Sequence, residues 1–183
     1  MTNVVLRTAK PGDIAEITRI YAYAVRHGTA SFELEPPDVA EMARRYYALA
    51  ERGFPYLVAQ SAGELLGYAY VGPYRARPAY HWTVENSIYV APEAHRRGVG
   101  TTLLRRLIEM SEAKGYRQMI AVIGDSANVA SIELHRALGF HMVGTLAHTG
   151  FKFGRWLDTV LMQRSLGPGA ATPPSAGLSS PPR

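Results

Sequence analysis

Strand-like and helix-like segments alternate along almost the whole of this 183-residue chain. A short apolar run at residues 4–6 is followed by a helical pattern that begins at Pro11-Gly12-Asp13 and repeats apolar residues every three or four positions. The predicted order is strand, two helices, three strands, helix, strand, helix and two strands. Such alternation is typical of helices that cover a sheet, so we predict a mixed α/β (α+β) fold.

Turn residues separate the predicted elements. We expect helices at 38–53, 98–114 and 128–138, a hairpin of strands 56–59 and 65–70 around Ala62-Gly63, and further strands at 84–90, 119–123, 141–146 and 157–163. The run at 119–123 is continuously apolar, which indicates a strand buried on both faces.

The chain divides into a domain and a tail. Residues 167–183 include five Pro, three Gly, three Ser and three Ala. A segment of this composition buries too little apolar surface to offset the entropy of ordering it. We therefore predict one domain over 1–166 and a flexible tail over 167–183.

Composition excludes several classes of protein. The chain has no cysteine, which excludes disulfides, cysteine-based zinc sites and a thiol nucleophile, and we expect no metal. We expect a cytoplasmic protein without a membrane partner, because no apolar run is long enough to span a bilayer and the N-terminus lacks a signal-peptide pattern. The net charge of +5 favours an anionic ligand. Nucleic-acid binding is suggested by that charge alone, so we expect no nucleic-acid partner.

A basic, glycine-containing loop follows the strand predicted at 84–90. Gly98 and Gly100 open the next helix, where free backbone amides and the helix dipole form an anion site. A P-loop would need a lysine after Gly100, and a dinucleotide fingerprint would need glycine at Leu103. The alternative is that the glycines only shape a helix start on a basic surface. The candidate phosphate-binding residues are His95, Arg96, Arg97, Gly98, Val99, Gly100, Thr101 and Thr102.

A polar stripe marks the helix predicted at 128–138. Asn128, Ser131 and His135 are spaced by three and four residues, so they share one helix face among small and apolar neighbours. Such a stripe faces a ligand or an internal hydrogen-bond network. From the helix alone, a structural histidine bonded to a carbonyl is favoured for His135.

These two segments resemble the GNAT superfamily of N-acetyltransferases. Arg96-Arg97-Gly98-Val99-Gly100 resembles its acetyl-CoA pyrophosphate loop, with His95 where members carry Gln or Arg. Residues 128–140 resemble the family's Asn-x-x-Ser/Ala-x-x-Leu-Tyr-x-x-x-Gly-Phe pattern, with His135 in place of the tyrosine. The resemblance implies a mixed central sheet flanked by about four helices and acetyl-CoA as the acetyl donor. It also implies a donor site formed by the loop together with Asn128, Ser131 and Ile88, Tyr89 and Val90, whose amides would stabilise the thioester oxyanion.

Acetyl transfer needs a base for the amine and an acid for the leaving thiolate. Glu85 lies within a predicted strand, where a carboxylate is costly unless it is paired or lines a cavity. We expect Glu85 to remove the amine proton, directly or through a water, with a strand-edge ion pair as the alternative. His135 titrates near neutrality and is the candidate acid, with the structural role still open.

Several segments are similar to phosphinothricin and methionine sulfoximine N-acetyltransferases, and the similarity covers residues 3–166. They include residues 29–36, 72–77, 82–87 and 150–156. This resemblance implies Glu85 and His135 as the catalytic pair and a homodimer. We expect direct attack on the thioester without a covalent enzyme intermediate, which the absence of cysteine fits, with a serine route as the alternative. The acceptor is then a small amino acid, which Arg75 and Arg77 would bind through its carboxylate or phosphinate while Phe32 packs on its stem. Each arginine is alternatively a solvated surface charge.

Other functions remain open at this point. The acceptor could be a protein N-terminus or a polyamine, although Arg75 and Arg77 would repel a polycation. A non-catalytic acyl-CoA-binding module would keep the phosphate loop without needing Glu85 or His135. The resemblance places Lys152, Arg155 and Trp156 in a late loop near a dimer interface, and no role is assigned to them.

Overall fold

The structure, a computed structural model, describes residues 4–174 and contains one seven-stranded mixed sheet. The strand order is β1-β2-β3-β4-β5-β7-β6. Only the pair β4–β5 is parallel, and the remaining neighbours run antiparallel. The mixed sheet confirms the predicted fold class. The strands are β1 (Val5–Thr8), β2 (Tyr56–Ser61), β3 (Glu64–Pro73), β4 (Thr83–Val90), β5 (Gln118–Gly124), β6 (His141–Lys152) and β7 (Arg155–Ser165).

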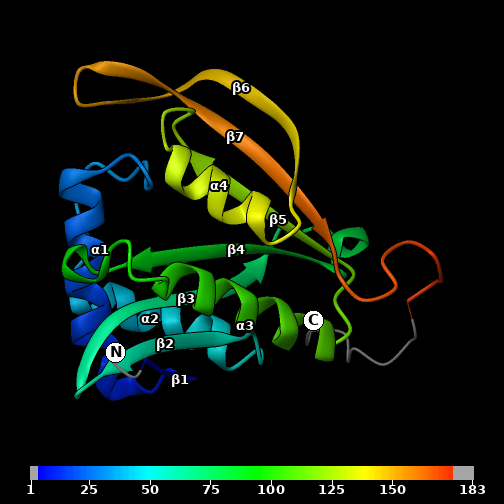
Figure 1. The fold of residues 1–183 in the computed structure, drawn as a ribbon, viewed down its shortest axis with the longest axis horizontal. Helices are drawn as coiled ribbons and strands as arrows, with labels where there is room; N and C mark the ends of the chain where they lie inside the picture. Colours follow the sequence, from blue (N-terminus) through cyan, green and yellow to red (C-terminus); the bar gives the residue numbers. More distant parts are fainter. Residues whose placement is uncertain (1–3, 175–183) are drawn as a thin grey trace.

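Four α-helices cover the two faces of this sheet in the described chain, as Figure 1 shows. They are α1 (Ile14–His27), α2 (Val39–Ala50), α3 (Val99–Ala113) and α4 (Val129–Ala137), with short 3-10 turns η1 (Pro11–Asp13), η2 (Pro78–Tyr80) and η3 (Pro92–Ala94). Helices α1 and α2 pack on the face that carries a stack of tyrosines, and α3 and α4 lie on the other face.

Local sequence explains where the helices begin and which face they bury. Asp38 caps α2, because its Oδ1 accepts a hydrogen bond of 2.8 Å from the Glu41 amide. Helix α1 buries Ile14, Ile17 and Tyr21 at the spacing of one helix face, as predicted.

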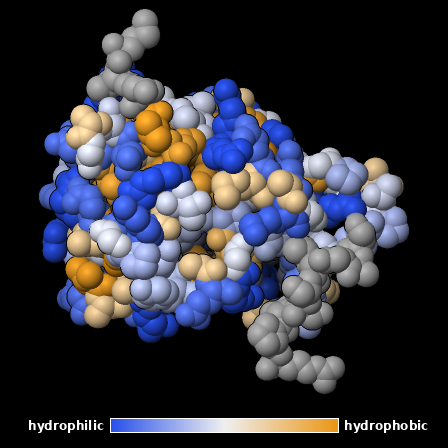
Figure 2. Space-filling model, turned by 90° about the horizontal axis from the view of Figure 1, so that it is seen from below, coloured by the Kyte–Doolittle hydropathy of each residue, from blue (hydrophilic) through white to orange (hydrophobic). Residues whose placement is uncertain are grey.

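Two kinds of side chain fill the core on the two sides of the sheet. On the α1 side, the rings of Tyr56, Tyr68 and Tyr89 stack in series, and Tyr21 of α1 meets Tyr89 edge-on. On the α3 side, leucines at 103, 104 and 107 are fully buried. On the face shown in Figure 2, hydrophilic side chains predominate and apolar ones reach the surface in small separate groups.

Strands β4 and β5 pair over only part of their lengths. Their register runs from Thr83 opposite Gln118 to Asn86 opposite Ala121. Beyond these four rungs β4 continues to Val90 and β5 continues to Gly124. The centre of the sheet is therefore open at the carboxyl ends of its two parallel strands.

The last hairpin differs from the prediction. The structure extends β6 to Lys152 and starts β7 at Arg155, so Lys152 and Trp156 lie in strands rather than in a loop. Phe153 and Gly154 form the two-residue turn, both with positive φ (52° and 72°). Such turns match the twist of paired strands, which explains why the hairpin can be long. It projects beyond the helices in Figure 1.

The first residues of the predicted tail contact the domain. The Arg117 guanidinium donates to the carbonyl oxygens of Gly169 and Pro173, at 3.1 Å each. Residues 175–183 lie outside the described residues, so the tail and its boundary remain predictions. None of the helices within residues 4–174 combines the length and apolarity that crossing a bilayer requires.

Candidate active site

A pocket of about 60 Å³ occupies the place where β4 and β5 separate. Its walls come from β4, β5 and α4, with Ala30 contributed by the segment between α1 and α2. The lining residues are Ala30, Asn86, Ser87, Ile88, Tyr89, Ala121, Val122, Ile123, Gly124, Asn128, Ser131 and His135. The pocket thus joins the predicted polar stripe to the strand that carries Glu85.

The stripe on α4 faces this pocket. Asn128, Ser131 and His135 all line it, as the spacing predicted for one shared face. Asn128 also caps α4, because its Oδ1 accepts from the Ser131 amide at 3.3 Å. The cap fixes where α4 begins and therefore where His135 lies one helical turn beyond Ser131.

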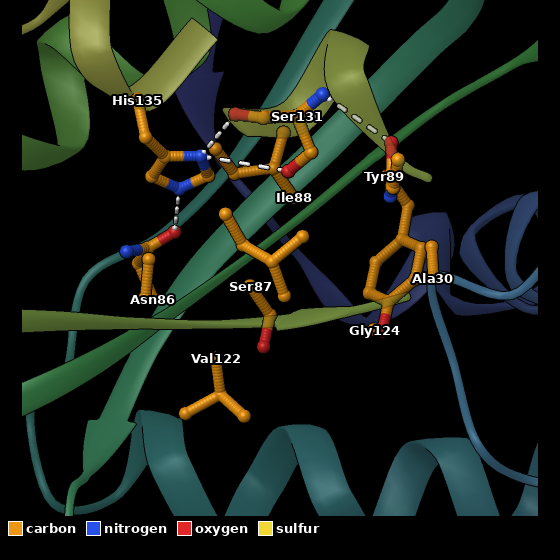
Figure 3. Close-up of a pocket in the computed structure, with 12 residues that line it drawn as sticks. Ala30, Asn86, Ser87, Ile88, Tyr89, Val122, Gly124, Ser131 and His135 are labelled. Atoms are coloured by element: carbon orange, nitrogen blue, oxygen red, sulfur yellow. Dashed lines mark hydrogen bonds between the residues drawn. The ribbon is translucent and has the colours of Figure 1, made fainter. Parts of the chain in front are cut away.

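His135 is held by both of its ring nitrogens (Figure 3). Nδ1 lies 2.7 Å from the Ser131 carbonyl oxygen, and Nε2 lies 3.0 Å from the Asn86 Oδ1. The side chain is only 4% exposed, and Phe140 packs edge-on against the ring. Burial lowers the pKa of His135, and the hydrogen bond to the Ser131 carbonyl partly opposes that shift.

Asn86 is a site residue that the sequence reasoning missed. Its Nδ2 donates to the Ile120 carbonyl oxygen at 3.1 Å, which turns Oδ1 towards His135. Asn86 is buried on the strand face that it shares with Val84 and Ile88. A polar residue within an otherwise apolar strand face was the signal that could have identified it.

Glu85 lies on the opposite face of β4 from Asn86 and His135, because successive strand residues alternate. The structure therefore does not bring Glu85 and His135 into one hydrogen-bonded pair. Burial raises the pKa of Glu85, and the nearby Arg75 charge partly opposes that shift. Gly72 is its partner on β3, so no side chain of β3 lies directly opposite the carboxylate.

The predicted acceptor residues come from the segment after β3 and from the connection between α1 and α2. Arg75 is exposed, interacts electrostatically with Glu85, and stacks its guanidinium over the Tyr74 ring at 5.1 Å. Arg77 is also exposed and precedes η2, where its carbonyl accepts from the Tyr80 amide. Phe32 follows the segment that forms the Ala30 wall, and its ring lies beside Gly124 and Gly150.

The predicted phosphate loop opens α3 without a side-chain cap. Gly98 occupies the N-cap position with a φ of 75°, and Arg96 also has a positive φ of 61°. The first amide to bond back into the helix is that of Thr102, which donates to the Gly98 carbonyl at 3.0 Å. The amides of the first turn, 99–101, thus have no acceptor within the helix and can bind an anion.

His95 has a local partner in this loop. Its Nε2 lies 3.0 Å from the Val90 carbonyl oxygen, so the ring ties the loop to the end of β4. Gly100 faces α4, where an added Cβ would lie 3.3 Å from Leu134 Cδ2. The glycine therefore allows α3 and α4 to approach each other beside the pocket.

The end of β4 directs backbone groups into the gap. In an antiparallel ladder alternate residues bond to the neighbouring strand, and the Ala91 amide donates to Leu66 of the β3 side. Ile88 and Val90 therefore present their amides to the β5 side, past the last recorded rung at Asn86. These amides are suited to a carbonyl oxygen that gains negative charge.

Three late residues had no assigned role. Lys152 is buried and bonds two carbonyl oxygens of the α1–α2 segment, while Arg155 pairs with Asp125 at the end of β5. Trp156 is 61% exposed and packs against Phe151. Within residues 4–174, no group of three or more His, Asp or Glu side chains could hold a metal ion.

Comparison with known proteins gives consistent matches over nearly the whole chain. Residues 6–161 match a family model described as an acetyltransferase (GNAT) domain. The chain is 53% identical over 169 residues to a phosphinothricin N-acetyltransferase of Alcaligenes faecalis, covering 92% of this chain and 86% of that protein. It is 43% identical over 169 residues to an L-methionine sulfoximine/L-methionine sulfone acetyltransferase of Pseudomonas paraeruginosa, covering 92% and 98%. The crystal structure of a GNAT superfamily phosphinothricin acetyltransferase from Sinorhizobium meliloti in complex with AcCoA matches with a TM-score of 0.94 and 49% identity, covering 98% of this chain and 96% of that one.

Proposed function

The chain belongs to the GNAT acetyltransferase family, and from this premise we propose that it moves the acetyl group of acetyl-CoA to the α-amine of a small amino-acid-like acceptor. The acceptors we propose are phosphinothricin, methionine sulfoximine and methionine sulfone, which are named for relatives 43–53% identical to this chain. The observation that carries the proposal is the pocket between β4 and β5, which is lined by backbone groups of β4 and by the polar stripe of α4.

The chain's own residues fit acetyl-CoA at two points. The uncapped first turn of α3, with Gly98 and Gly100, suits a pyrophosphate, and Arg96 and Arg97 add positive charge. The gap between β4 and β5 suits an extended chain that pairs with free strand amides, with Asn128 and Ser131 on the facing wall. Bound there, acetyl-CoA would supply an acetyl group activated as a thioester.

We propose Glu85 as the base that takes the proton of the acceptor amine. Burial raises the pKa of Glu85, and a raised pKa brings a carboxylate closer to the range in which it accepts protons efficiently. Arg75 limits that rise and keeps the group able to ionise. Because Glu85 lies on the face of β4 away from α4, the amine would approach from the side opposite His135.

We propose that His135 supplies a proton to the leaving sulfur. The two oxygens that contact its ring favour the protonated form, while burial disfavours it. Ile88 and Val90 would donate backbone hydrogen bonds to the carbonyl oxygen of the thioester.

We propose that the acceptor's acidic groups are bound by Arg75 and Arg77 and that Phe32 borders its stem. The charge of Arg75 acts on Glu85, so a carboxylate or phosphinate bound to its guanidinium would bring the α-amine towards the base. Arg77 is farther along the same exposed segment and would add a second donor group.

We further propose a cytoplasmic homodimer. Exposed apolar side chains gather on the β6–β7 hairpin, and such a gathering is unusual for the surface of a monomer. They are Met142, Val143, Leu146, Phe151, Phe153 and Trp156. Sedimentation velocity would give the mass in solution, and cell fractionation would give the location.

A thiol-release assay with acetyl-CoA tests the proposed activity. The acceptor panel should hold phosphinothricin, methionine sulfoximine, methionine sulfone, ordinary amino acids, spermidine and a peptide with a free N-terminus. We expect turnover on the first three. Turnover on spermidine or the peptide alone would overturn the acceptor pocket, and acetyl-CoA binding without any turnover would indicate a binding module.

A further inference from the structure

We propose that Lys152 is a positioning residue for the acceptor side of the active site. Its ammonium group holds residues 28–33, the first part of the connection between α1 and α2, to the β6–β7 hairpin. This segment supplies the Ala30 wall of the pocket. The inference rests on the proposed function, because it assigns this segment to acceptor binding.

The contacts of Lys152 join parts of the chain that are far apart in sequence. Its Nζ donates to the carbonyl oxygen of Gly28 at 3.0 Å and to that of Ser31 at 2.8 Å. The residue is only 3% exposed, and burial lowers the pKa of its ammonium group, opposed by the charge of Glu33. A buried charge is costly unless hydrogen bonds compensate it, so these two carbonyl groups are its main compensation.

Two glycines provide a slot for the same segment, which is an independent observation. A Cβ at Gly150 of β6 would lie 2.5 Å from Phe32 Cε2. One at Gly124 of β5 would clash first with the Thr29 carbonyl oxygen and would lie 2.9 Å from Phe32 Cε1. Neither glycine has a positive φ. Both positions therefore need glycine for space, which the Phe32 ring fills at Gly150 and which Thr29 and Phe32 together fill at Gly124.

The fastened segment borders the reaction site. Ala30 lies between the two residues whose carbonyl groups Lys152 binds, and it lines the pocket opposite α4. Ser31 also links the segment to α1, since its Oγ is 2.9 Å from the Tyr21 hydroxyl. Moving the segment would displace Phe32 and Ala30 without touching the start of α3.

The test is the variant Lys152→Met, which keeps most of the length of the side chain and removes the donors. We expect KM for the acceptor to rise about tenfold or more, since hydrogen bonds to a charged group are strong, while KM for acetyl-CoA stays within about twofold. The exposed Lys114, at the end of α3, provides the control Lys114→Met with unchanged constants. Gly150→Ala should reproduce the acceptor effect by displacing the Phe32 ring.

A merely structural role predicts a different pattern. It would lower Tm and change kcat and both KM values together, and that result in Lys152→Met would overturn the proposal. Hydrogen exchange gives a readout that needs no acceptor: we expect faster exchange in Lys152→Met confined to residues 28–33. Unchanged exchange there would also overturn the proposal. If exchange is faster in Lys152→Met but the parent enzyme is inactive on the whole panel, the role of Lys152 in holding residues 28–33 would stand and the proposed function would be rejected.

Discussion

The carboxamide of Asn86 on β4 and the imidazole of His135 on α4 are joined by a hydrogen bond of 3.0 Å inside the pocket. The Asn86 Nδ2 is occupied by the Ile120 carbonyl, so its Oδ1 can only accept, and His135 Nε2 must be the donor. Nδ1 faces a second acceptor, the Ser131 carbonyl. The surrounding oxygens therefore favour a protonated ring, whereas burial favours a neutral one.

Replacing Asn86, the neutral partner of His135, by an anionic residue should change the pKa of His135. In Asn86→Asp a carboxylate would face Nε2, and we expect the pKa of His135 to rise, because a nearby opposite charge favours the protonated ring. Titration of the His135 ring signals by NMR would measure the change. In the matched control Asn86→Leu, which offers no acceptor, the pKa should fall instead. Equal values in both variants would show that the Asn86 contact does not control the ring.

The same group should make stability depend on pH. Because the pKa of His135 in the folded state lies below the value of 6.5 for the free side chain, the unfolded chain takes up this proton first as the pH falls. The folded state therefore loses stability as the pH drops below about 6.5, by up to about 1.4 kcal/mol for each pH unit until the folded pKa is reached. Urea unfolding at pH 7.5 and 5.5 would measure this loss, and we expect a smaller loss in His135→Gln. A larger loss in the variant would contradict the sign.

Glu85→Gln tests the proposed base. A neutral amide cannot accept the amine proton, and we expect kcat to fall by about 100-fold or more. The binding of CoA should be nearly unchanged, because the phosphate loop lies elsewhere. In the parent enzyme activity should rise with pH through a pKa above the usual 4.5 of glutamate, and this rise should be lost in the variant. Full activity in Glu85→Gln would remove Glu85 from the mechanism.

Gly100→Val tests the start of α3 as the phosphate site. The added side chain would press against Leu134 and crowd the free amides of the first turn. We expect the Kd for CoA, measured by calorimetry, to rise about tenfold or more, equivalent to about 1.4 kcal/mol. Gly144→Val on β6 is the control, since no atom lies within 4 Å of its added Cβ. Equal affinity in both variants would contradict the assignment of the phosphate loop.

Most of the fold follows from local patterns. The helix over 98–114 and the strand over 119–123 were predicted within two residues of α3 and β5, because apolar periodicity and flanking turn residues act over short distances. The long β6–β7 hairpin was not predicted. Its turn contains Phe153 with a positive φ, and a positive φ is not expected from the sequence at a bulky residue.

The site was predictable where one element carries it and not where several elements meet. The stripe of Asn128, Ser131 and His135 lies on one helix, so spacing alone placed it on one face. The partnership of His135 with Asn86 spans 49 positions, and that of Lys152 with Gly28 spans 124. Such contacts depend on how strands and helices pack, which no local pattern encodes.

The short pairing of β4 with β5 affects the stability of the sheet. The sheet consists of two half-sheets joined across four rungs, and a linear molecule bound between the free strand edges would link them for as long as it is bound. A ligand that binds only the folded chain adds about 2.7 kcal/mol to its stability at a concentration 100 times its Kd. The enzyme with a bound donor would therefore be the more stable form. After each release of product, the two half-sheets would again be joined only by the four rungs, at the place where the next donor binds.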